Sequence, residues 1–312
     1  MRILIVTSYN NATVAPFIAE QVEGLRSMGV ECEYYLLQGK GIRGYLHNLP
    51  LLKASIGRFR PDVIHAHYGL CGLLSSLQRK VPVVTTFHGS DVNRRELLPL
   101  SLLAHWRSAH SIFVSRSLAR RCHASVQHST VLPCGVDTTL FVPLPRDEAR
   151  RRLYLPMEQP LVLFAGAYAD STKNIGLARA AIRHLSGVRL IELRGYSREE
   201  TVSLFNAVDL LLVTSHREGS PQVVKEALAC NCPVVSVDVG DVRDQLRGVE
   251  GCRIVDRNEH SLAQAIRERL DEPMHQYGRQ HILDRQLDTL HTVQKLNSIY
   301  SSIHARTDRA NR

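Results

Sequence analysis

The chain has 312 residues, which is long enough for two domains that each bury a core of their own. Hydrophobic residues make up 44% of the chain and charged residues 22%, a globular composition that excludes the disordered and fibrous classes. No run of 18 apolar residues occurs, so we expect no transmembrane helix. The net charge of +9 favours an anionic partner, such as a phosphorylated substrate, a membrane surface or a nucleic acid.

The first residues and the cysteines indicate the cellular compartment. The apolar start, MRILIV at residues 1–6, is too short for the hydrophobic region of a signal peptide and predicts a buried strand instead. The seven cysteines are scattered and form no C-x-x-C pair, so we expect a cytoplasmic protein with reduced, partly buried thiols. His65 and His67 share one face of a strand end and could hold a metal ion, although histidines at loop edges more often form hydrogen bonds.

In the first half of the chain, apolar strands alternate with segments of helical spacing. Strands are expected at residues 2–7, 31–37, 61–65, 81–87, 111–114 and 130–132. Helices are expected at residues 14–28, after Gly69 and after Ser115. The run from Gly39 to Gly44 matches G-x-G-x-x-G, but it follows the second strand and carries Lys40 and Arg43 between its glycines. Because a dinucleotide site normally follows the first strand, nicotinamide-cofactor binding is kept only as an alternative.

Residues 34–61 contain no acidic residue. The basic residues in this stretch are Lys40, Arg43, Lys53, Arg58 and Arg60. The apolar residues that recur in it at helical spacing are Tyr45, Leu49, Leu52, Ile56 and Phe59. Such a stripe either packs onto the core, with the basic face in solvent, or lies on anionic lipid.

The second half begins after a Pro-rich, charged stretch at residues 142–147, which predicts a linker. Strands are then expected at residues 161–165, 188–193, 209–213, 233–237 and 253–255. Helices are expected to start near Lys173, Ser197 and Ser261, and a long last helix should cover residues 279–303.

Strand–helix alternation in both halves predicts an α/β protein with two facing, doubly wound, Rossmann-like domains. We place the N-terminal domain at residues 1–142 and the C-terminal domain at residues 143–290. Residues 291–312 form the C-terminal helix and tail, and we expect that helix to cross back to the N-terminal domain.

The most informative stretch follows the strand predicted at residues 209–213. The chain turns at Glu218 and Gly219 and enters a helix, with Ser220 as the expected N-cap and Pro221 as the first helical residue. A helix N-terminus at the carboxyl edge of a parallel sheet is suited to an anionic ligand. Glu218 precedes the helix and Glu226 lies about two turns inside it. On these residues alone, an ordinary strand–loop–helix unit with solvated glutamates is the simpler interpretation.

The wider segment SHREGSPQVVKEALACNCPVV, at residues 215–235, changes that interpretation. It resembles the donor-site signature, with its E-x7-E pair, of retaining GT-B glycosyltransferases of the family-4 type. The subgroup that it most resembles makes teichuronic acid and other cell-surface polysaccharides. Further matching segments are PDVIHAH at 61–67, TFHGSD at 86–91, VSRS at 114–117 and LPCGVD at 132–137. The resemblance implies a GT-B fold and transfer of a sugar from a nucleotide sugar, with a UDP-sugar expected, to a hydroxyl group of a glycan or lipid-linked acceptor.

The resemblance also implies roles on the donor side. Lys173 and the main-chain N–H groups from Gly219 and Ser220 onward would hold the diphosphate. Glu226 would accept the ribose hydroxyls, and Glu218 would lie beside the sugar ring as a catalytic residue. The remaining donor-binding candidates are Arg194, Pro221 and Tyr196, the last of which would pack against the base.

On the opposite side, the resemblance places the catalytic His88 near the anomeric carbon and the acceptor. The other acceptor-side candidates are Asn10, Asn11, His67, Asp91 and Ser115. No D-x-D triplet occurs, so we expect no metal and no cofactor beyond the nucleotide sugar as co-substrate. Ala167 stands where the family usually has an arginine, so one diphosphate cation is missing or is replaced by Arg194 or another arginine.

Other interpretations remain open at this stage. A nucleotide-sugar epimerase could use the same fold, and a degenerate, non-enzymatic member could bind a glycan or a partner transferase. Nucleic-acid binding is not expected, because the basic stretch lacks interleaved aromatic residues. The acid-free stretch at residues 34–61 predicts peripheral attachment to the anionic inner face of the cell membrane.

Overall fold

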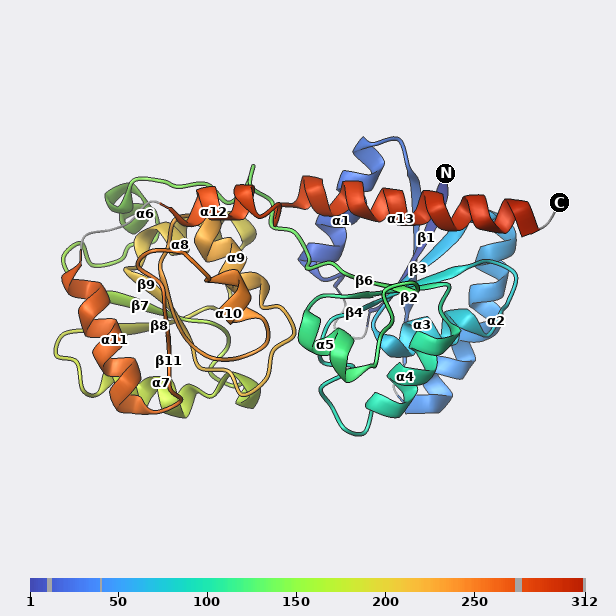
Figure 1. Cartoon of the computed structure of the whole chain (residues 1–312). Coiled ribbons are helices and arrows are strands. Elements are labelled where there is room, and N and C mark those ends of the chain that lie inside the picture. Colours follow the sequence, from blue (N-terminus) through green and yellow to red (C-terminus); the bar gives the residue numbers. More distant parts are fainter. Residues whose placement is uncertain (10–12, 40, 273–276, 311–312) are drawn as a thin grey trace. The chain divides into compact units, whose positions relative to one another are not determined.

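The computed structural model describes residues 1–9, 13–39, 41–272 and 277–310. The chain divides into two compact units (Figure 1), of which the first comprises Met1–Gly135 with Thr289–Arg312 and the second comprises Val136–Asp288. The end of the chain therefore returns to the first unit, which confirms the expected crossing of the C-terminal helix. The acceptor-side candidates Asn10 and Asn11 lie outside the described residues.

The first unit contains a parallel sheet with the strand order β2-β1-β3-β4-β5-β6. Its strands are β1 (Arg2–Ser8), β2 (Glu31–Leu37), β3 (Val63–His67), β4 (Val83–Phe87), β5 (His110–Phe113) and β6 (Ser129–Val131). Its helices are α1 (Pro16–Ser27), α2 (Gly41–Phe59), α3 (Gly69–Ser76), α4 (Leu98–Arg107), α5 (Arg116–Arg121) and α13 (Thr289–Ala310). The order of the strands reverses between β1 and β3, which is where open α/β sheets bind ligands.

The last helix is part of the first unit's core. The side chains that α13 contributes to this core are Val293, Leu296, Tyr300 and Ile303. Figure 1 shows α13 alongside α1, and the two helices approach closely because Gly24 of α1 has no side chain. A Cβ atom on Gly24 would lie 2.8 Å from Cγ2 of Val293, inside the contact distance of two carbon atoms.

The structure decides between the two interpretations of the basic stretch. Leu52, Ile56 and Phe59 of α2 are buried in a core cluster, and Tyr45 and Leu49 pack against it. The apolar stripe thus packs onto the sheet, whereas Leu46 and Leu51 of the same helix are exposed together with its polar and basic residues.

The glycines of the G-x-G-x-x-G match have a packing role. Gly39 has a φ of +109°, and a Cβ atom there would lie 3.0 Å from Cα of Gly44. The end of β2 therefore lies directly against the first turn of α2. Asn48 closes this contact by donating to the carbonyls of Gln38 and Gly44, at 2.8 and 2.7 Å.

The second unit also contains a parallel sheet, which has five strands in the order β11-β10-β9-β7-β8. Its strands are β7 (Leu161–Phe164), β8 (Arg189–Glu192), β9 (Leu210–Val213), β10 (Val234–Val237) and β11 (Arg253–Val255). Its helices are α6 (Arg146–Arg152), the 3-10 helix η1 (Ser171–Lys173), α7 (Ile175–Ile182), α8 (Arg198–Ala207), α9 (Gln222–Ala229), α10 (Val242–Gln245), α11 (Glu259–Asp271) and α12 (Gly278–Asp284). Here the strand order reverses between β7 and β9.

The Pro-rich stretch predicted as a linker packs onto the second unit. The N–H of Leu144 donates to Oδ1 of Asn206 at 2.7 Å, and Arg146 forms an ion pair with Asp209. Arg150 of α6 is fully buried, where it pairs with Asp209 at 3.0 Å and donates to the carbonyl of Ala207. A buried guanidinium needs such partners, so the chain from Val136 onward is fixed to this unit.

The prediction of one long last helix at residues 279–303 is wrong, because the chain forms two separate helices there, α12 and α13. The segment between α12 and α13 contains Gln286, whose φ of +53° ends the helical path. The carbonyl of Leu287 accepts from the N–H of Val136 at 2.9 Å, which joins this segment to the start of the second unit. The break falls where the chain passes from the second unit to the first.

Two properties agree with the composition. All seven cysteines are free, and five of them are buried. Within the described ranges, no helix combines the length and the hydropathy that a membrane span requires.

Candidate functional site

The predicted donor-side residues Lys173 and Glu218 lie together in the second unit. Lys173 ends η1, in the loop after β7, and Glu218 lies in the loop after β9. These two strands are neighbours at the point where the sheet order reverses. Nζ of Lys173 donates to Oε1 of Glu218 at 2.7 Å, and both side chains are partly exposed. A cation and a carboxylate therefore meet at the edge where a ligand is expected.

Two glycines let these side chains take their places. Gly166, at the end of β7, has a φ of +152°, and a Cβ atom on it would lie 2.8 Å from Cγ of Lys173. Gly240 follows β10 with a φ of +61°, and a Cβ atom there would lie 3.0 Å from Cβ of Glu218. Any larger residue would displace the lysine or the glutamate.

The helix after the turn begins one residue later than expected. Pro221 occupies the N-cap position of α9 and Gln222 is its first residue, so the prediction of Ser220 as N-cap is wrong. The hydroxyl of Ser220 instead accepts from Nζ of Lys225 and from Nε2 of Gln245, both at 3.1 Å. Lys225 is fully buried, and its need for a partner explains why Ser220 turns away from the helix end.

A buried polar network underlies the turn. Gln245 donates to Oδ1 of Asp241 at 2.6 Å as well as to Ser220. Burial raises the pKa of Asp241, while the positive charge of Lys225 acts in the opposite direction. These hydrogen bonds from Lys225 and Gln245 fix the hydroxyl of Ser220 from beneath the turn.

The turn leaves main-chain donors available. Within the described residues, the N–H groups of Gly219 and Ser220 have no hydrogen-bond partner. They precede the N-terminus of α9, where the helix dipole adds partial positive charge. This combination favours an anion such as a phosphate group.

Glu226, the second glutamate of the pair, is buried in α9 and bound to an arginine that the sequence did not predict. Oε1 of Glu226 accepts from NH1 of Arg198 at 2.7 Å. The guanidinium of Arg198 lies 4.6 Å from the centre of the Phe141 ring, which fixes its position. Arg198 is the first residue of α8. The one sequence signal for its place in the donor site is its position at a helix start, two residues after Tyr196.

The other predicted donor residues are placed differently. Tyr196 is partly buried against the core of the second unit, whereas Arg194 is exposed. A further cation, Arg257, donates from NH1 to the carbonyls of Thr214 and Ser215 at 3.1 and 2.7 Å. It follows β11 and reaches the end of β9, a proximity that no sequence motif signals.

In the first unit, the predicted His67 and His88 form a pair. Nδ1 of His67 lies 3.0 Å from Nε2 of His88, and Sγ of Cys134 lies 3.8 Å from Nδ1 of His88. Burial lowers the pKa of His67 well below its usual value, so its ring is neutral. One proton between the two facing nitrogens makes one ring the donor and the other the acceptor.

The ring of His65 is held inside the first unit by hydrogen bonds on both sides. Its Nδ1 lies 2.6 Å from the hydroxyl of Tyr300 in α13, and its Nε2 lies 2.7 Å from Oγ1 of Thr86. Burial lowers the pKa of His65 to about 3. Both ring nitrogens are used in hydrogen bonds, so the pair of His65 and His67 is not arranged to hold a metal ion.

Asp91 and Ser115 are buried and bound to the main chain. Asp91 accepts from the N–H of Gly89 at 2.8 Å and from the N–H of Gly69 at 3.0 Å, which ties the loop carrying His88 to the start of α3. Burial raises the pKa of Asp91. Ser115 is the N-cap of α5, and its hydroxyl accepts from the N–H of Leu118.

Comparison with known proteins gives consistent results for sequence and structure. Residues 15–140 match Glycosyltransferase Family 4, and residues 159–272 match Glycosyl transferases group 1. The chain is 27% identical to a D-inositol 3-phosphate glycosyltransferase of Thermobispora bispora, over 69% of this chain and 63% of that protein. It is also 27% identical to TuaC of Bacillus subtilis, whose name refers to teichuronic acid biosynthesis, over 66% of this chain and 60% of TuaC. The chain thus spans about three fifths of the length of these relatives.

Solved structures show the same fold. Sucrose-phosphate synthase of Thermosynechococcus elongatus superposes with a TM-score of 0.87 at 17% identity, covering 98% of this chain and 99% of that one. HepE of Anabaena, solved with UDP and glucose, superposes with a TM-score of 0.75 at 15% identity, covering 97% and 100%. The two parallel α/β units have the GT-B fold, and the family matches cover most of both. The chain therefore belongs to the GT-B glycosyltransferases of the family-4 type.

Proposed function

We propose that the protein transfers a hexose-type sugar from a UDP-sugar to a hydroxyl group of a glycan or lipid-linked acceptor. The proposal includes retention of the anomeric configuration, independence of metal ions and a cytoplasmic location. The observation that carries it is the Lys173–Glu218 pair, where the sheet order reverses, beside the N–H groups of Gly219 and Ser220, which no group in the described part of the chain accepts from.

The diphosphate of the donor is the leaving group, and its negative charge grows as the glycosidic bond breaks. Lys173 would leave Glu218 in part and donate to the diphosphate, and the N–H groups of the turn would bind the same oxygens. A charged donor and oriented main-chain dipoles stabilise developing charge most when they are already in place. The hydrogen bonds under the turn fix its main-chain groups, and the pairing with Glu218 positions Lys173 beside them.

The nucleoside would be held by Glu226. Arg198 occupies Oε1 of that carboxylate and orients it, which leaves Oε2 to accept from the ribose hydroxyls. Glu218 would bind hydroxyls of the transferred sugar once Lys173 engages the diphosphate. On the acceptor side, His67 would fix the orientation of His88 beside the reacting carbon.

Several findings support the donor class. The HepE structure with the same fold was solved in complex with UDP-glucose, and the relative TuaC is named for teichuronic acid biosynthesis. The absence of a D-x-D triplet from the sequence supports a mechanism in which Lys173 and the helix start replace a bridging metal.

The test is a thermal-shift titration with UDP, GDP and ADP. We expect UDP to raise the Tm of the wild type and to have little effect on Glu226→Ala. Glu250→Ala, which removes an exposed acid of the same unit, is the matched control and should respond like the wild type. If no nucleotide stabilises the wild type, or if Glu226→Ala responds fully, the donor site is assigned wrongly.

Ala167 favours one alternative, a degenerate member that binds a glycan or a partner without transferring sugar. A lost diphosphate contact would weaken donor binding by roughly one to two orders of magnitude if nothing replaced it. Sugar transfer, or slow hydrolysis of the donor by the purified protein, would eliminate this alternative. An epimerase on the same fold would convert the donor without releasing UDP.

A further inference from the structure

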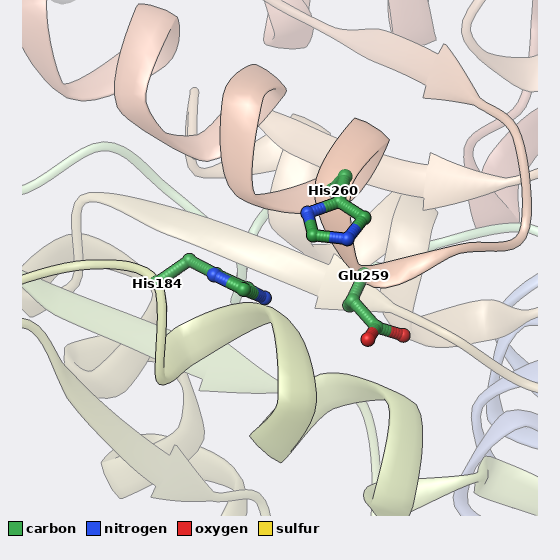
Figure 2. Close-up of side chains that lie close together, drawn as sticks. All are labelled: His184, Glu259 and His260. Carbon is green, nitrogen blue, oxygen red and sulfur yellow. The ribbon is translucent and has the colours of Figure 1, made fainter.

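Three potential metal ligands converge on the surface of the second unit (Figure 2). His184 follows α7, and Glu259 and His260 are the first residues of α11. One ligand atom from each residue lies within 4.8 Å of the other two. The ring centres of His184 and His260 are 4.8 Å apart. Two segments that are distant in the sequence thus present two imidazoles and a carboxylate to one point.

These ligand groups are not used elsewhere. Across the ranges that the structure describes, the side chains of His184, Glu259 and His260 make no hydrogen bond and no ion pair. The buried histidines of the first unit differ, since His65 and His67 both have ring nitrogens in hydrogen bonds. The donors of the surface cluster are therefore available to an ion.

The donor set selects a class of metal. Two imidazole nitrogens and one carboxylate suit Zn²⁺ and its neighbours Co²⁺, Ni²⁺ and Cu²⁺, whereas Mg²⁺ and Ca²⁺ prefer oxygen ligands alone. Metal–ligand bonds of about 2.1 Å would require the three side chains to move together by roughly 1 Å. His184 and His260 are exposed, so rotation of their side chains meets little resistance.

The surroundings favour a cation. The same surface groove is lined by Glu268 and Asp271 of α11. Arg267 also lines it, but its guanidinium donates to the carbonyl of His184 at 3.2 Å, which already ties the two segments together. A bound ion would reinforce a contact that the protein makes without it.

We propose that His184, Glu259 and His260 form a binding site for one divalent transition-metal ion of the zinc class, which clamps the end of α7 to the start of α11. Both elements adjoin the donor loops, since α7 follows Lys173 and α11 follows Arg257. The clamp would stabilise the second unit, and it is independent of the proposed sugar transfer, in which no metal takes part.

The experiment is calorimetric titration of the full chain, purified without a polyhistidine tag, with ZnCl₂. We expect one Zn²⁺ per chain, at least tenfold weaker binding by His184→Ala and by His260→Ala, and a Zn²⁺-dependent rise in Tm that both variants lose. His47→Ala, which removes an exposed histidine of the first unit, should bind like the wild type. MgCl₂ should give no binding under the same conditions.

Co²⁺ supplies a second readout that separates this site from the seven cysteines. Ligation by nitrogen and oxygen gives weak d–d absorption without the intense thiolate charge-transfer band. The proposal is overturned if the folded wild type binds no Zn²⁺ or if the double variant His184→Ala, His260→Ala binds it equally well. A thiolate band, or an equal loss in His47→Ala, would likewise assign the ion to other residues.

Discussion

Glu218 and Glu226 have the same residue type and lie eight positions apart, yet their environments differ. Glu218 is partly exposed and paired with a partly exposed lysine, while Glu226 is buried and paired with an arginine that stacks on Phe141. A ligand can displace the first pairing at low cost, because a lysine ammonium moves freely on its stem. The second pairing is part of the site's structure.

The role of Arg198 can therefore be tested by its loss. Arg198→Ala should leave Glu226 unoriented, so we expect the KM for the nucleotide sugar to rise about tenfold, with a smaller change in kcat. The measurement is steady-state kinetics over a range of donor concentrations. Arg183→Ala, an exposed arginine of the same unit, is the control. An unchanged KM in Arg198→Ala would remove this arginine from the donor site.

Among the elements, α13 packs against α1 at a position that has room only for glycine. Gly24→Ala places a methyl group 2.8 Å from Val293, and overpacking of this kind costs about 1–3 kcal/mol. Alanine in a helix is itself more favourable than glycine by about 0.5–1 kcal/mol. In the otherwise wild-type chain, we expect Gly24→Ala to lower the free energy of unfolding. In a Val293→Ala background, where the clash is absent, we expect the same substitution to raise it.

Urea unfolding of the two single variants and the double variant measures this coupling. Strictly additive free energies of unfolding would show that α13 does not pack on α1 through this contact.

The central strands, such as β1, β7, β9 and β10, were predictable because each is a short, nearly continuous apolar run, as parallel strands buried on both faces must be. The edge strand β2 was predictable although Glu31 and Glu33 interrupt its apolar residues. The run at residues 31–37 coincides with β2. The break before α13 was not predictable, because the helical pattern continues through it and only the contact between Leu287 and Val136 shows why the chain turns. Ser220 fits the rules for an N-cap, but the buried Lys225 competes for its hydroxyl.

The candidate site, like the fold, could be predicted only where a local sequence pattern marks its residues. Glu218 and Glu226 could be predicted because they lie in one contiguous motif, and Lys173 because the family resemblance implies its role. Arg198 and Arg257 could not be predicted, since each reaches the site from another part of the chain and its partner is a side chain or a carbonyl distant in the sequence. Tertiary proximity of this kind leaves no local pattern.

For the whole molecule, the buried histidines predict how stability depends on pH. The unfolded chain protonates His65 near pH 6.5, while the folded chain does so only near pH 3. Between these values the unfolded state binds the extra proton, so the free energy of unfolding falls as the pH falls. In this range, a fall of one pH unit lowers the folding equilibrium constant by up to about tenfold for each such histidine.

Urea unfolding at pH 7.0 and 5.5 checks this dependence. His65→Gln should lower stability at both values but reduce the difference between them. A difference as large as that of the wild type would show that His65 is not the group responsible.

The charge distribution predicts membrane association. The acid-free stretch at residues 34–61 should attract anionic lipid chiefly through its basic residues, because the apolar stripe of α2 is used in the core while Leu46 and Leu51 remain exposed. We expect cosedimentation with phosphatidylserine-containing vesicles that weakens as the salt concentration rises, and no binding to neutral vesicles. Absence of binding at low salt, or binding that ignores salt, would contradict this prediction.

We propose above that the loops after β7 and β9 hold the diphosphate of a nucleotide sugar and promote its departure without a metal. The most direct test of this proposal is the release of free nucleotide from a panel of UDP- and GDP-sugars, in the presence of EDTA, by the wild type and by Lys173→Met. We predict release of UDP by the wild type, faster with an acceptor, and a loss of about two orders of magnitude in the variant. Release that requires a divalent ion, or equal rates for the two proteins, would contradict the account.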